Sequence, residues 1–277
     1  MSNISYRFLK VVVVVVVLAG VFLIYRDFCD FCDASVPIFA YHRVEQASDI
    51  YSVPPKDFDA QMAYLHNEGY TSMTLHDYAI SRQKHEKLYK KMVLIFDDGY
   101  RDNLTNAAPI LQKYGYKGSI FLAVKFEGWP GYLDWDSDLK LLKYGWEIGS
   151  HTYNHKPLTT LTPKQVDYEL IASKEYVEGL YNPPGGLTLS YPTGACNKQV
   201  AKQVADAGYI AAVCGNVGVN TDKVPMQELR RVNAFYKKKD SLTYFKRHLL
   251  KAQLASWSLS HGIDFMGIWD KIRGNVR

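Results

Sequence analysis

A buried strand that ends in two acidic residues constrains the fold of this 277-residue chain more than any other feature. Residues 93–96 read Val-Leu-Ile-Phe, and Asp97, Asp98 and Gly99 follow directly. A continuous apolar run of this kind is typical of a strand covered on both faces, as in a parallel sheet or a β/α barrel. Such a strand delivers its last side chains to the mouth of the barrel, where active sites lie. An Asp-Gly turn without a chemical role is the alternative interpretation.

Strand-like and helix-like segments alternate along the chain, and no internal repeat is present. The alternation predicts a parallel-stranded α/β fold, either a barrel or an open sheet, and the length suits one domain of β/α-barrel size. Asp97-Asp98, His151 and Tyr191-Pro192 all fall at the ends of expected strands. The expected strands are residues 36–44, 70–75, 93–96, 119–124, 146–149, 187–191, 209–213 and 229–232, and the expected helices are residues 56–68, 103–114, 135–144, 163–180, 198–207 and 241–255.

An apolar segment with seven consecutive valines covers residues 8–25. Its uninterrupted part, residues 11–25, is short for a membrane span but sufficient when flanking residues snorkel. Arg7 and Lys10 lie on its N-terminal side, which places that end in the cytoplasm. A cleaved signal peptide is the alternative, and the polyvaline run argues against a buried core helix.

These observations divide the chain into two parts. Residues 1–33 are expected to be a signal-anchor with a short linker, and residues 34–277 the catalytic domain. We therefore expect a single-pass protein of the cell membrane whose catalytic domain is extracytoplasmic. If the N-terminal segment is cleaved, the protein is secreted instead.

Charge and cysteine content narrow the possible classes of protein. The net charge is +5, but the lysines are scattered, so nothing favours nucleic-acid binding. Cys29 and Cys32 form a CxxC pair without a preceding βαβ pattern or a second pair, which disfavours a thioredoxin-like or zinc-binding role. Cys196 and Cys214 can form a disulfide if the domain is extracytoplasmic.

Two histidines four residues apart, His151 and His155, are candidate metal ligands. On a helical turn they share one face and can bind one ion. With Asp98 they make two imidazoles and a carboxylate, the three-ligand set of a catalytic metal site with one position open for water. Such a metal lowers the pKa of water from about 15.7 to roughly 7, and Asp97 could then take the proton. His42, at the end of the first expected strand, is the best-placed proton donor for a departing amine.

Two sequence motifs resemble those of the NodB-type polysaccharide deacetylases, carbohydrate esterase family 4. They are Phe96-Asp97-Asp98-Gly99-Tyr100 and Ser150-His151-Thr152-x-x-His155, and the resemblance extends over about residues 36–255. It implies a distorted (β/α) barrel of the NodB-homology type, here preceded by one transmembrane helix. It also implies that Asp97 is the general base, that Asp98, His151 and His155 bind a divalent metal, most often Zn²⁺, and that the substrate is an N-acetylated, sometimes O-acetylated, polysaccharide.

The later motifs depart from the common family pattern. The third motif usually carries an arginine before a proline pair and a tyrosine, but residues 189–194 read Leu-Ser-Tyr-Pro-Thr-Gly. The Tyr41-His42-Arg43 and Tyr191-Pro192-x-Gly194 segments instead resemble the branch that deacetylates poly-β-1,6-N-acetylglucosamine in biofilm matrix. In that branch the early histidine takes the role of the late one.

Further residue roles follow from this resemblance. His42 is the expected general acid, and His261, in a late Leu-x-His sequence, is the second choice. Arg231, in a Leu-x-Arg-Val strand end typical of this branch, is expected to replace the missing arginine and orient Asp97; a surface salt bridge is the alternative. Candidate residues of the substrate groove, each with a purely structural role as the alternative, are Tyr100, Asn103, Trp135, Tyr191 and Pro192.

The sequence thus predicts a membrane-anchored, metal-dependent N-deacetylase, monomeric, whose substrate is poly-β-1,6-N-acetylglucosamine. The alternatives are a deacetylase of peptidoglycan or chitin oligomers, an esterase for O-acetylated glycan, and a glycan-binding protein without turnover. A glycosidase that uses Asp97 with a distant acid leaves His151 and His155 unexplained.

Overall fold

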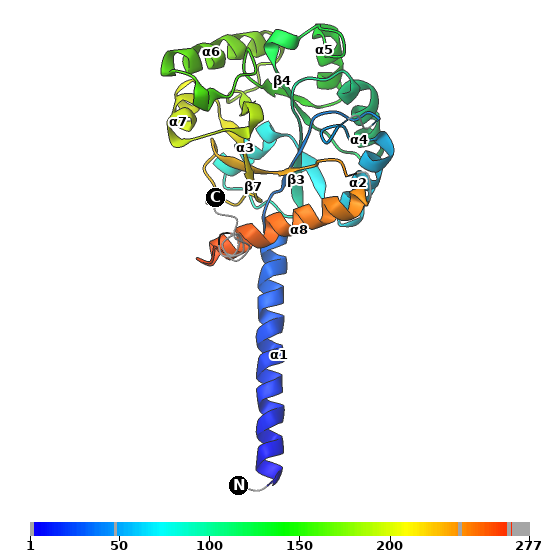
Figure 1. Ribbon diagram of the computed structural model, residues 1–277, viewed down its shortest axis with the longest axis vertical. Helices are drawn as coiled ribbons and strands as arrows, with labels where there is room; N and C mark the ends of the chain where they lie inside the picture. Colours follow the sequence, from blue (N-terminus) through cyan, green and yellow to red (C-terminus); the bar gives the residue numbers. More distant parts are fainter. Residues whose placement is uncertain (1–2, 47–48, 238–239, 265–266, 268–277) are drawn as a thin grey trace.

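The computed structural model describes residues 3–46, 49–237, 240–264 and 267. One long helix, α1 (Asn3–Ala34), extends away from the globular part of the chain (Figure 1). The globular part alternates strands and helices as the sequence predicts. Its strands are β1 (Ile38–Tyr41), β2 (Thr71–Met73), β3 (Lys91–Phe96), β4 (Ser119–Leu122), β5 (Glu147–Ser150), β6 (Thr188–Ser190), β7 (Ala211–Val217) and β8 (Leu229–Asn233); its α-helices are α2 (Pro55–Asn67), α3 (Leu75–Gln83), α4 (Ala108–Lys113), α5 (Trp135–Lys143), α6 (Pro163–Leu180), α7 (Lys198–Asp206) and α8 (Ser241–Ser260); short helical turns are η1 (Asn103–Ala107), η2 (Val124–Phe126), η3 (Leu158–Thr160) and η4 (Pro192–Gly194).

Seven of the eight strands in the described residues close into a parallel barrel, in the order β1-β8-β7-β6-β5-β4-β3. The ring is closed by β1 and β3, where Ile38 pairs with Val93 and Tyr41 with Phe96. Strand β2 stays outside the ring and pairs with the first half of β3. The distorted (β/α) barrel expected from the sequence is therefore confirmed, and one apolar helix precedes it.

The barrel wall separates two layers of apolar side chains. Successive side chains of a strand alternate between the barrel interior and the outer helices, so the interior row of β3 continues from Ile95 to Asp97. Gly149 of β5 makes room for the interior ring of Phe121, because a Cβ at Gly149 would lie 2.5 Å from that ring. Interior residues include Ile38, Ala40, Val93, Ile95, Phe121, Ala211, Val213 and Leu229, and outer residues include Phe39, Leu94, Phe96, Ile120, Ile148, Leu189 and Val232.

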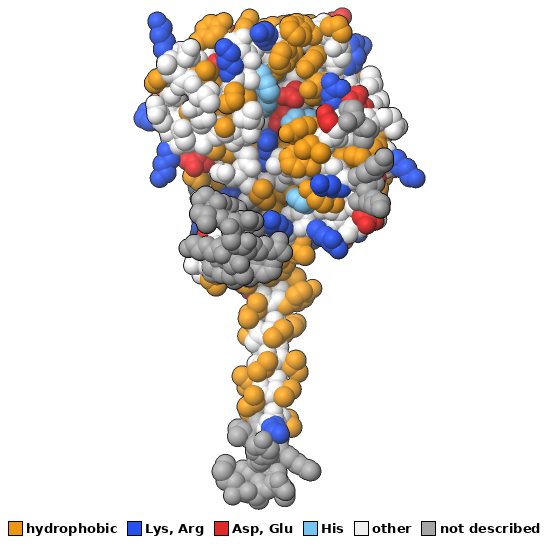
Figure 2. All heavy atoms as spheres, in the orientation of Figure 1, with side chains coloured by type: hydrophobic (Ala, Val, Ile, Leu, Met, Phe, Trp, Pro, Cys, Tyr) orange, Lys and Arg blue, Asp and Glu red, His pale blue; other side chains and the backbone are white. Residues whose placement is uncertain are grey.

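Helix α1 has an exposed apolar surface. Its valines are exposed, and apolar side chains cover the coloured part of the helix in Figure 2. The segment Lys10–Ala34 is long and apolar enough to cross a membrane. The helix leads directly into the start of β1, so it joins the barrel at the amino ends of the strands (Figure 1). The carboxyl ends, where sites of this fold lie, are at the other end of the barrel.

One disulfide links the segment after η4 to β7. Cys196 and Cys214 are bonded, with 5.8 Å between their Cα atoms. Cys29 and Cys32, both on α1, are free thiols. A disulfide is typical of proteins in an oxidising compartment and agrees with an outward-facing barrel.

Replacing both Cys196 and Cys214 with serine is expected to lower the free energy of unfolding by about 3 kcal/mol. The bridge closes a segment of 18 residues, and its loss raises the conformational entropy of the unfolded chain. Denaturant unfolding of the full chain in detergent measures the change. The matched control is Cys29→Ser with Cys32→Ser, which keeps the bridge and is expected to unfold like the unmodified chain. Equal losses in both double variants would contradict the prediction.

Candidate active site

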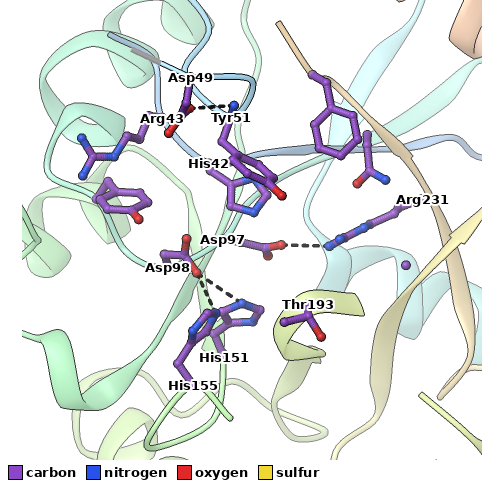
Figure 3. Close-up of a pocket in the computed structure, with 14 residues that line it drawn as sticks. His42, Arg43, Asp49, Tyr51, Asp97, Asp98, His151, His155, Thr193 and Arg231 are labelled. Atoms are coloured by element: carbon purple, nitrogen blue, oxygen red, sulfur yellow. Dashed lines mark hydrogen bonds and ion pairs between the residues drawn. The ribbon is translucent and has the colours of Figure 1, made fainter. Parts of the chain in front are cut away.

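One pocket gathers the chemical groups at the carboxyl ends of the strands (Figure 3). Its volume is about 430 Å³. Side chains reach it from the ends of several strands, as is typical of β/α barrels. The lining residues are His42, Arg43, Asp49, Tyr51, Asp97, Asp98, Tyr100, His151, His155, Thr193, Gly215, Arg231, Asn233 and Phe235.

Asp98, His151 and His155 converge in this pocket as candidate metal ligands. Asp98 Oδ1 lies 3.4 Å from His151 Nε2 and 3.1 Å from His155 Nε2, and the ligand atoms all lie within 4.8 Å of one another. Burial raises the pKa of Asp98, but His151 and His155 lower it more strongly, so the carboxylate stays ionised. Apart from these two imidazole nitrogens, the buried Asp98 Oδ1 has no polar partner among the described residues. This donor set fits a divalent cation such as Zn²⁺.

A backbone carbonyl fixes the orientation of His151. Its Nδ1 lies 2.7 Å from the carbonyl oxygen of Ser190, which can only accept, so Nδ1 donates and Nε2 faces Asp98. Metal-binding histidines are commonly held this way through their other ring nitrogen. Burial lowers the pKa of His151, but the Asp97 and Asp98 carboxylates raise it overall, so a proton and a cation compete for Nε2.

The expectation that His151 and His155 share a helical turn is wrong. Residues 151–157 form an irregular loop, in which Thr152 has a φ of 66° and His155 a φ of 58°. These left-handed conformations fold the loop back, so that the two imidazole rings lie 4.8 Å apart. Asp98, with a φ of 77°, is also left-handed. Such conformations are uncommon for residues other than glycine and concentrate at functional sites.

Asp97 continues the interior row of β3 and meets Arg231 of β8. Arg231 Nη1 donates a hydrogen bond of 2.9 Å to Asp97 Oδ2, and both side chains are buried, so the alternative of a surface salt bridge does not hold. Asp97 Oδ1 is buried without a hydrogen-bond partner among the described residues. Gly194 lets η4 approach this pair, because a Cβ there would lie 2.5 Å from Gly215 Cα and 3.1 Å from Arg231 Nη2.

His42 lies across the two aspartates from the two histidines (Figure 3). The register explains this position, because Tyr41 pairs with Phe96 and the next residue of each strand enters the pocket. The amide of Asp97 donates to the carbonyl of Tyr41 at 2.9 Å and extends the pairing by one step. Burial lowers the pKa of His42, and the Asp97 and Asp98 carboxylates only partly oppose this effect.

Polar side chains of the turn after β3 hold the backbone that carries His42. Asn103 Nδ2 donates to the carbonyl of His42 at 2.9 Å, and Asn106 Nδ2 donates to the carbonyl of Val44 at 2.7 Å. Asp102 Oδ1 accepts a hydrogen bond of 2.6 Å from the amide of Val44, and burial raises the pKa of Asp102 to about 6. Asn103, a candidate groove residue in the sequence, is therefore buried, and its role is to hold the backbone of His42.

Of the other groove candidates, only Tyr100 lines the pocket. Tyr191 is buried, and its hydroxyl donates to a backbone carbonyl at 2.9 Å. Pro192 is also buried. Trp135 lies at the start of α5, partly exposed, and packs edge to face on an aromatic ring of α6. The structure therefore does not bring these three residues to the pocket, because Tyr191 points to the outer layer of the barrel and α5 lies outside it.

His261, the second choice for the acid, lies at the end of α8. Its Nε2 is 3.2 Å from Asp27 Oδ2 of α1. That position is at the α1 end of the barrel, and His261 is absent from the described residues that line the pocket. Of the two candidates for the acid, His42 is therefore the one that the fold brings to the pocket with Asp97 and Asp98.

Sequence reasoning missed five lining residues, which are Asp49, Tyr51, Gly215, Asn233 and Phe235. Asn233 follows Arg231 by two positions on β8, so the strand alternation could have identified it. Tyr51 and Phe235 come from loops without a recognisable pattern. Their rings are 5.5 Å apart, and Tyr51 also lies 4.9 Å from the ring of His42.

Comparisons with known proteins show which family the chain belongs to. The family model for polysaccharide deacetylases matches residues 84–212. YxkH of Bacillus subtilis (strain 168), whose name assigns it to the polysaccharide deacetylases, is 34% identical over 200 residues, which cover 72% of this chain and 71% of that protein. The poly-β-1,6-N-acetyl-D-glucosamine N-deacetylase of Staphylococcus aureus (strain MSSA476) is 24% identical over 197 residues, covering 61% of this chain and 68% of that protein. The solved structure of the Streptococcus pyogenes deacetylase PplD has a similar fold, with a TM-score of 0.69 at 23% identity, over 80% of this chain and 99% of that one. The chain therefore belongs to the polysaccharide deacetylase family, the NodB-type enzymes that its two motifs resemble.

Proposed function

We propose that this chain removes N-acetyl groups from a polysaccharide of the cell surface or biofilm matrix, with a divalent metal held by Asp98, His151 and His155. One observation carries the proposal: the buried Asp97–Arg231 ion pair lies in the same pocket as this ligand cluster and His42. A base, a metal site and an acid that face one cavity are the parts that amide hydrolysis requires.

The cluster suits a zinc ion in particular. Two neutral imidazoles and one carboxylate are a common catalytic zinc set, and the carbonyl of Ser190 supports the His151 ligand. A zinc ion held there would supply positive charge that polarises an acetyl carbonyl and acidifies water.

Asp97 is the general base in this proposal. Arg231 engages its Oδ2 and keeps the carboxylate oriented, while the buried Oδ1 remains available to take a proton. Water adds to the acetyl carbon as Asp97 accepts the water proton. The C–N bond then breaks, His42 delivers a proton to the nitrogen, and acetate leaves. Burial disfavours the protonated form of His42 that this step needs, and the Asp97 and Asp98 carboxylates offset part of that effect on its pKa.

His42→Ala is expected to lower kcat for N-acetyl substrates by about 10²-fold or more, because the amine then departs without a proton donor. An activated aryl acetate, whose leaving group needs no proton, should be affected much less. Acetate release from both substrates measures the effect. The matched control is His261→Ala, which should leave both rates unchanged; a larger loss for His261→Ala than for His42→Ala would reverse the assignment.

The proposed substrate is poly-β-1,6-N-acetylglucosamine. The first support is that the segments around His42 and Arg231 resemble those of the branch that acts on this polymer. The second is the similarity to the poly-β-1,6-N-acetyl-D-glucosamine N-deacetylase of Staphylococcus aureus. The rivals are peptidoglycan, chitin oligomers and O-acetylated glycans, since one metal site can serve both amide and ester bonds. A glycan-binding protein without turnover is a further rival, against which the complete set of metal and base residues argues.

Acetate release by the full chain in detergent tests this proposal. The substrates are β-1,6-linked N-acetylglucosamine oligomers, chitin oligomers, peptidoglycan and an O-acetylated glycan, each assayed after chelation and after zinc is restored. Zinc-dependent release from the β-1,6 oligomers is the expected result. Faster release from another substrate would keep the mechanism and change the substrate, and no release from any of them by the zinc-loaded protein would favour the glycan-binding protein.

We further propose that residues 1–33 anchor the protein and that residues 34–277 form the catalytic domain outside the cell. The exposed apolar surface of α1 and the disulfide between Cys196 and Cys214 support this arrangement. Cell fractionation and mass spectrometry of the native N-terminus test it. Recovery of the protein from the medium without residues 1–25 would refute anchoring.

A further inference from the structure

Helix α8 carries an exposed apolar stripe that the proposed chemistry does not use. Leu250 is 47% exposed and Leu254 is 38% exposed, although both belong to a helix packed on the barrel. Leu250, Leu254, Trp257 and His261 are spaced by four, three and four residues, so they lie on one side of the helix axis. The buried residues of α8, such as Phe245 and Leu249, lie on the other side.

The second half of this stripe contacts α1. Trp257 Nε1 donates a hydrogen bond of 2.7 Å to Asp27 Oδ2, and its ring lies 5.7 Å from the ring of Phe28. His261 Nε2 lies 3.2 Å from the same Asp27 oxygen. In Figure 1, α8 runs across the barrel end of α1. Leu250 and Leu254 therefore point to the side of α8 on which α1 leaves the barrel.

The contact of Trp257 and His261 with α1 fixes the position of α8 along the axis of α1. Asp27 and Phe28 come two and three residues after Tyr25, the last residue of the exposed apolar run. At about 1.5 Å per residue, they lie only ~3–5 Å beyond it. If α1 crosses a membrane, this level is the interface between hydrocarbon and water, where tryptophan is favoured. The exposed leucines of α8 would then lie at the same level.

The charge of α8 matches such a surface. Its 20 residues contain no aspartate or glutamate. Lys246, Arg247 and Lys251 are exposed and flank the leucine stripe. Apolar side chains bordered by cations are typical of helices that lie in the plane of a membrane that contains anionic lipids.

We propose that the outer face of α8 lies in the headgroup layer of an anionic lipid leaflet, parallel to the membrane that α1 crosses. This inference rests on the proposed membrane anchoring of α1 and not on the deacetylase reaction. Contact at α1 and at α8 restricts rotation of the barrel about the single anchor. The barrel is thereby held with its amino end on the bilayer and its pocket at the end that faces away.

Nitroxide labelling of the full chain in lipid nanodiscs tests the position of α8. Single labels are placed at Leu254→Cys, at Ile171→Cys on α6 and at Val16→Cys on α1, in a Cys29→Ser, Cys32→Ser background. Ile171 is a matched control, since it is 50% exposed on a helix away from α1. The readout is the ratio of collisions with oxygen, which concentrates in lipid, to collisions with a water-soluble nickel chelate.

In nanodiscs with anionic lipid, the ratio at residue 254 is expected to be several-fold above that at residue 171 and below that at residue 16. Equal ratios at residues 254 and 171, with a high ratio at residue 16, would overturn the proposal while leaving the anchor intact. A water-like ratio at residue 16 would overturn both. None of these outcomes depends on acetate release.

The charge requirement is tested with two triple variants that carry the label at residue 254. Lys246→Gln, Arg247→Gln and Lys251→Gln together should lower the ratio in anionic nanodiscs. Lys140→Gln, Lys143→Gln and Lys164→Gln, which remove three exposed lysines elsewhere, should not change it. Equal ratios in both triple variants would overturn the assignment to an anionic surface.

Discussion

Asp97→Asn is expected to lower kcat for acetate release by about 10³-fold while leaving zinc bound. Loss of a general base typically lowers the reaction rate by about 10²–10⁴-fold, and asparagine cannot take the water proton. The amide oxygen of asparagine can still accept from Arg231 Nη1, so the geometry of the pocket is preserved. Asp98, His151 and His155 are unaffected, so the zinc content should not change. Steady-state acetate release and elemental analysis of the same protein sample measure both effects.

Asp136→Asn is the matched control for this substitution. Asp136 is exposed on the first turn of α5, and the same chemical change there should leave both activity and zinc content unaltered. Near-normal turnover of Asp97→Asn would remove Asp97 from the proposed role. Loss of zinc together with activity would instead mean that Asp97 belongs to the metal site.

Asp98→Ala is expected to abolish both zinc retention and turnover. The substitution removes the one carboxylate of the cluster and leaves two imidazoles, which no longer make a three-ligand site. The loss of zinc affinity should exceed the 10–100-fold that is typical when an outer partner of a ligand is removed. Competition with a zinc-binding dye measures the affinity directly, without reference to activity.

Asp97→Asn serves as the comparison for Asp98→Ala, because the two residues are adjacent and only one is a proposed ligand. Circular dichroism and unfolding curves establish that Asp98→Ala is folded. Full zinc affinity in folded Asp98→Ala would contradict the proposed ligand set. Activity that survives chelation of the unmodified chain would contradict metal dependence altogether.

The sequence was sufficient to predict the fold class and several residues that meet in the candidate site. Buried strands such as residues 93–96 are apolar on both faces, and helices show a 3.6-residue period, so both are visible as local patterns. Asp97, Asp98 and His151 were identifiable because they follow strands directly, and carboxyl ends of parallel strands meet at one end of a barrel; His155 was identifiable from its spacing of four residues from His151. Their presence in one pocket follows from that rule.

Other features of the site depended on the tertiary structure. The His151–His155 loop is not helical, because two left-handed residues reverse the chain and local spacing does not reveal them. Arg231 lies more than 130 positions from Asp97 in sequence, and only barrel closure through β1 brings the two together. The register of a strand against its neighbours decides whether each side chain faces the barrel interior or the outer helices. This register points Tyr191 outward and Arg231 inward.

The fold also places His42 and His261 at different ends of the barrel. Both follow plausible sequence patterns, but the β1–β3 register places His42 beside Asp97, while α8 carries His261 to α1. The sequence by itself determined which residue types are available and which segments form strands and helices, because these follow from local periodicity. Tertiary structure decided which of them meet, because contacts between distant segments depend on strand register, barrel closure and helix packing, which no local pattern encodes.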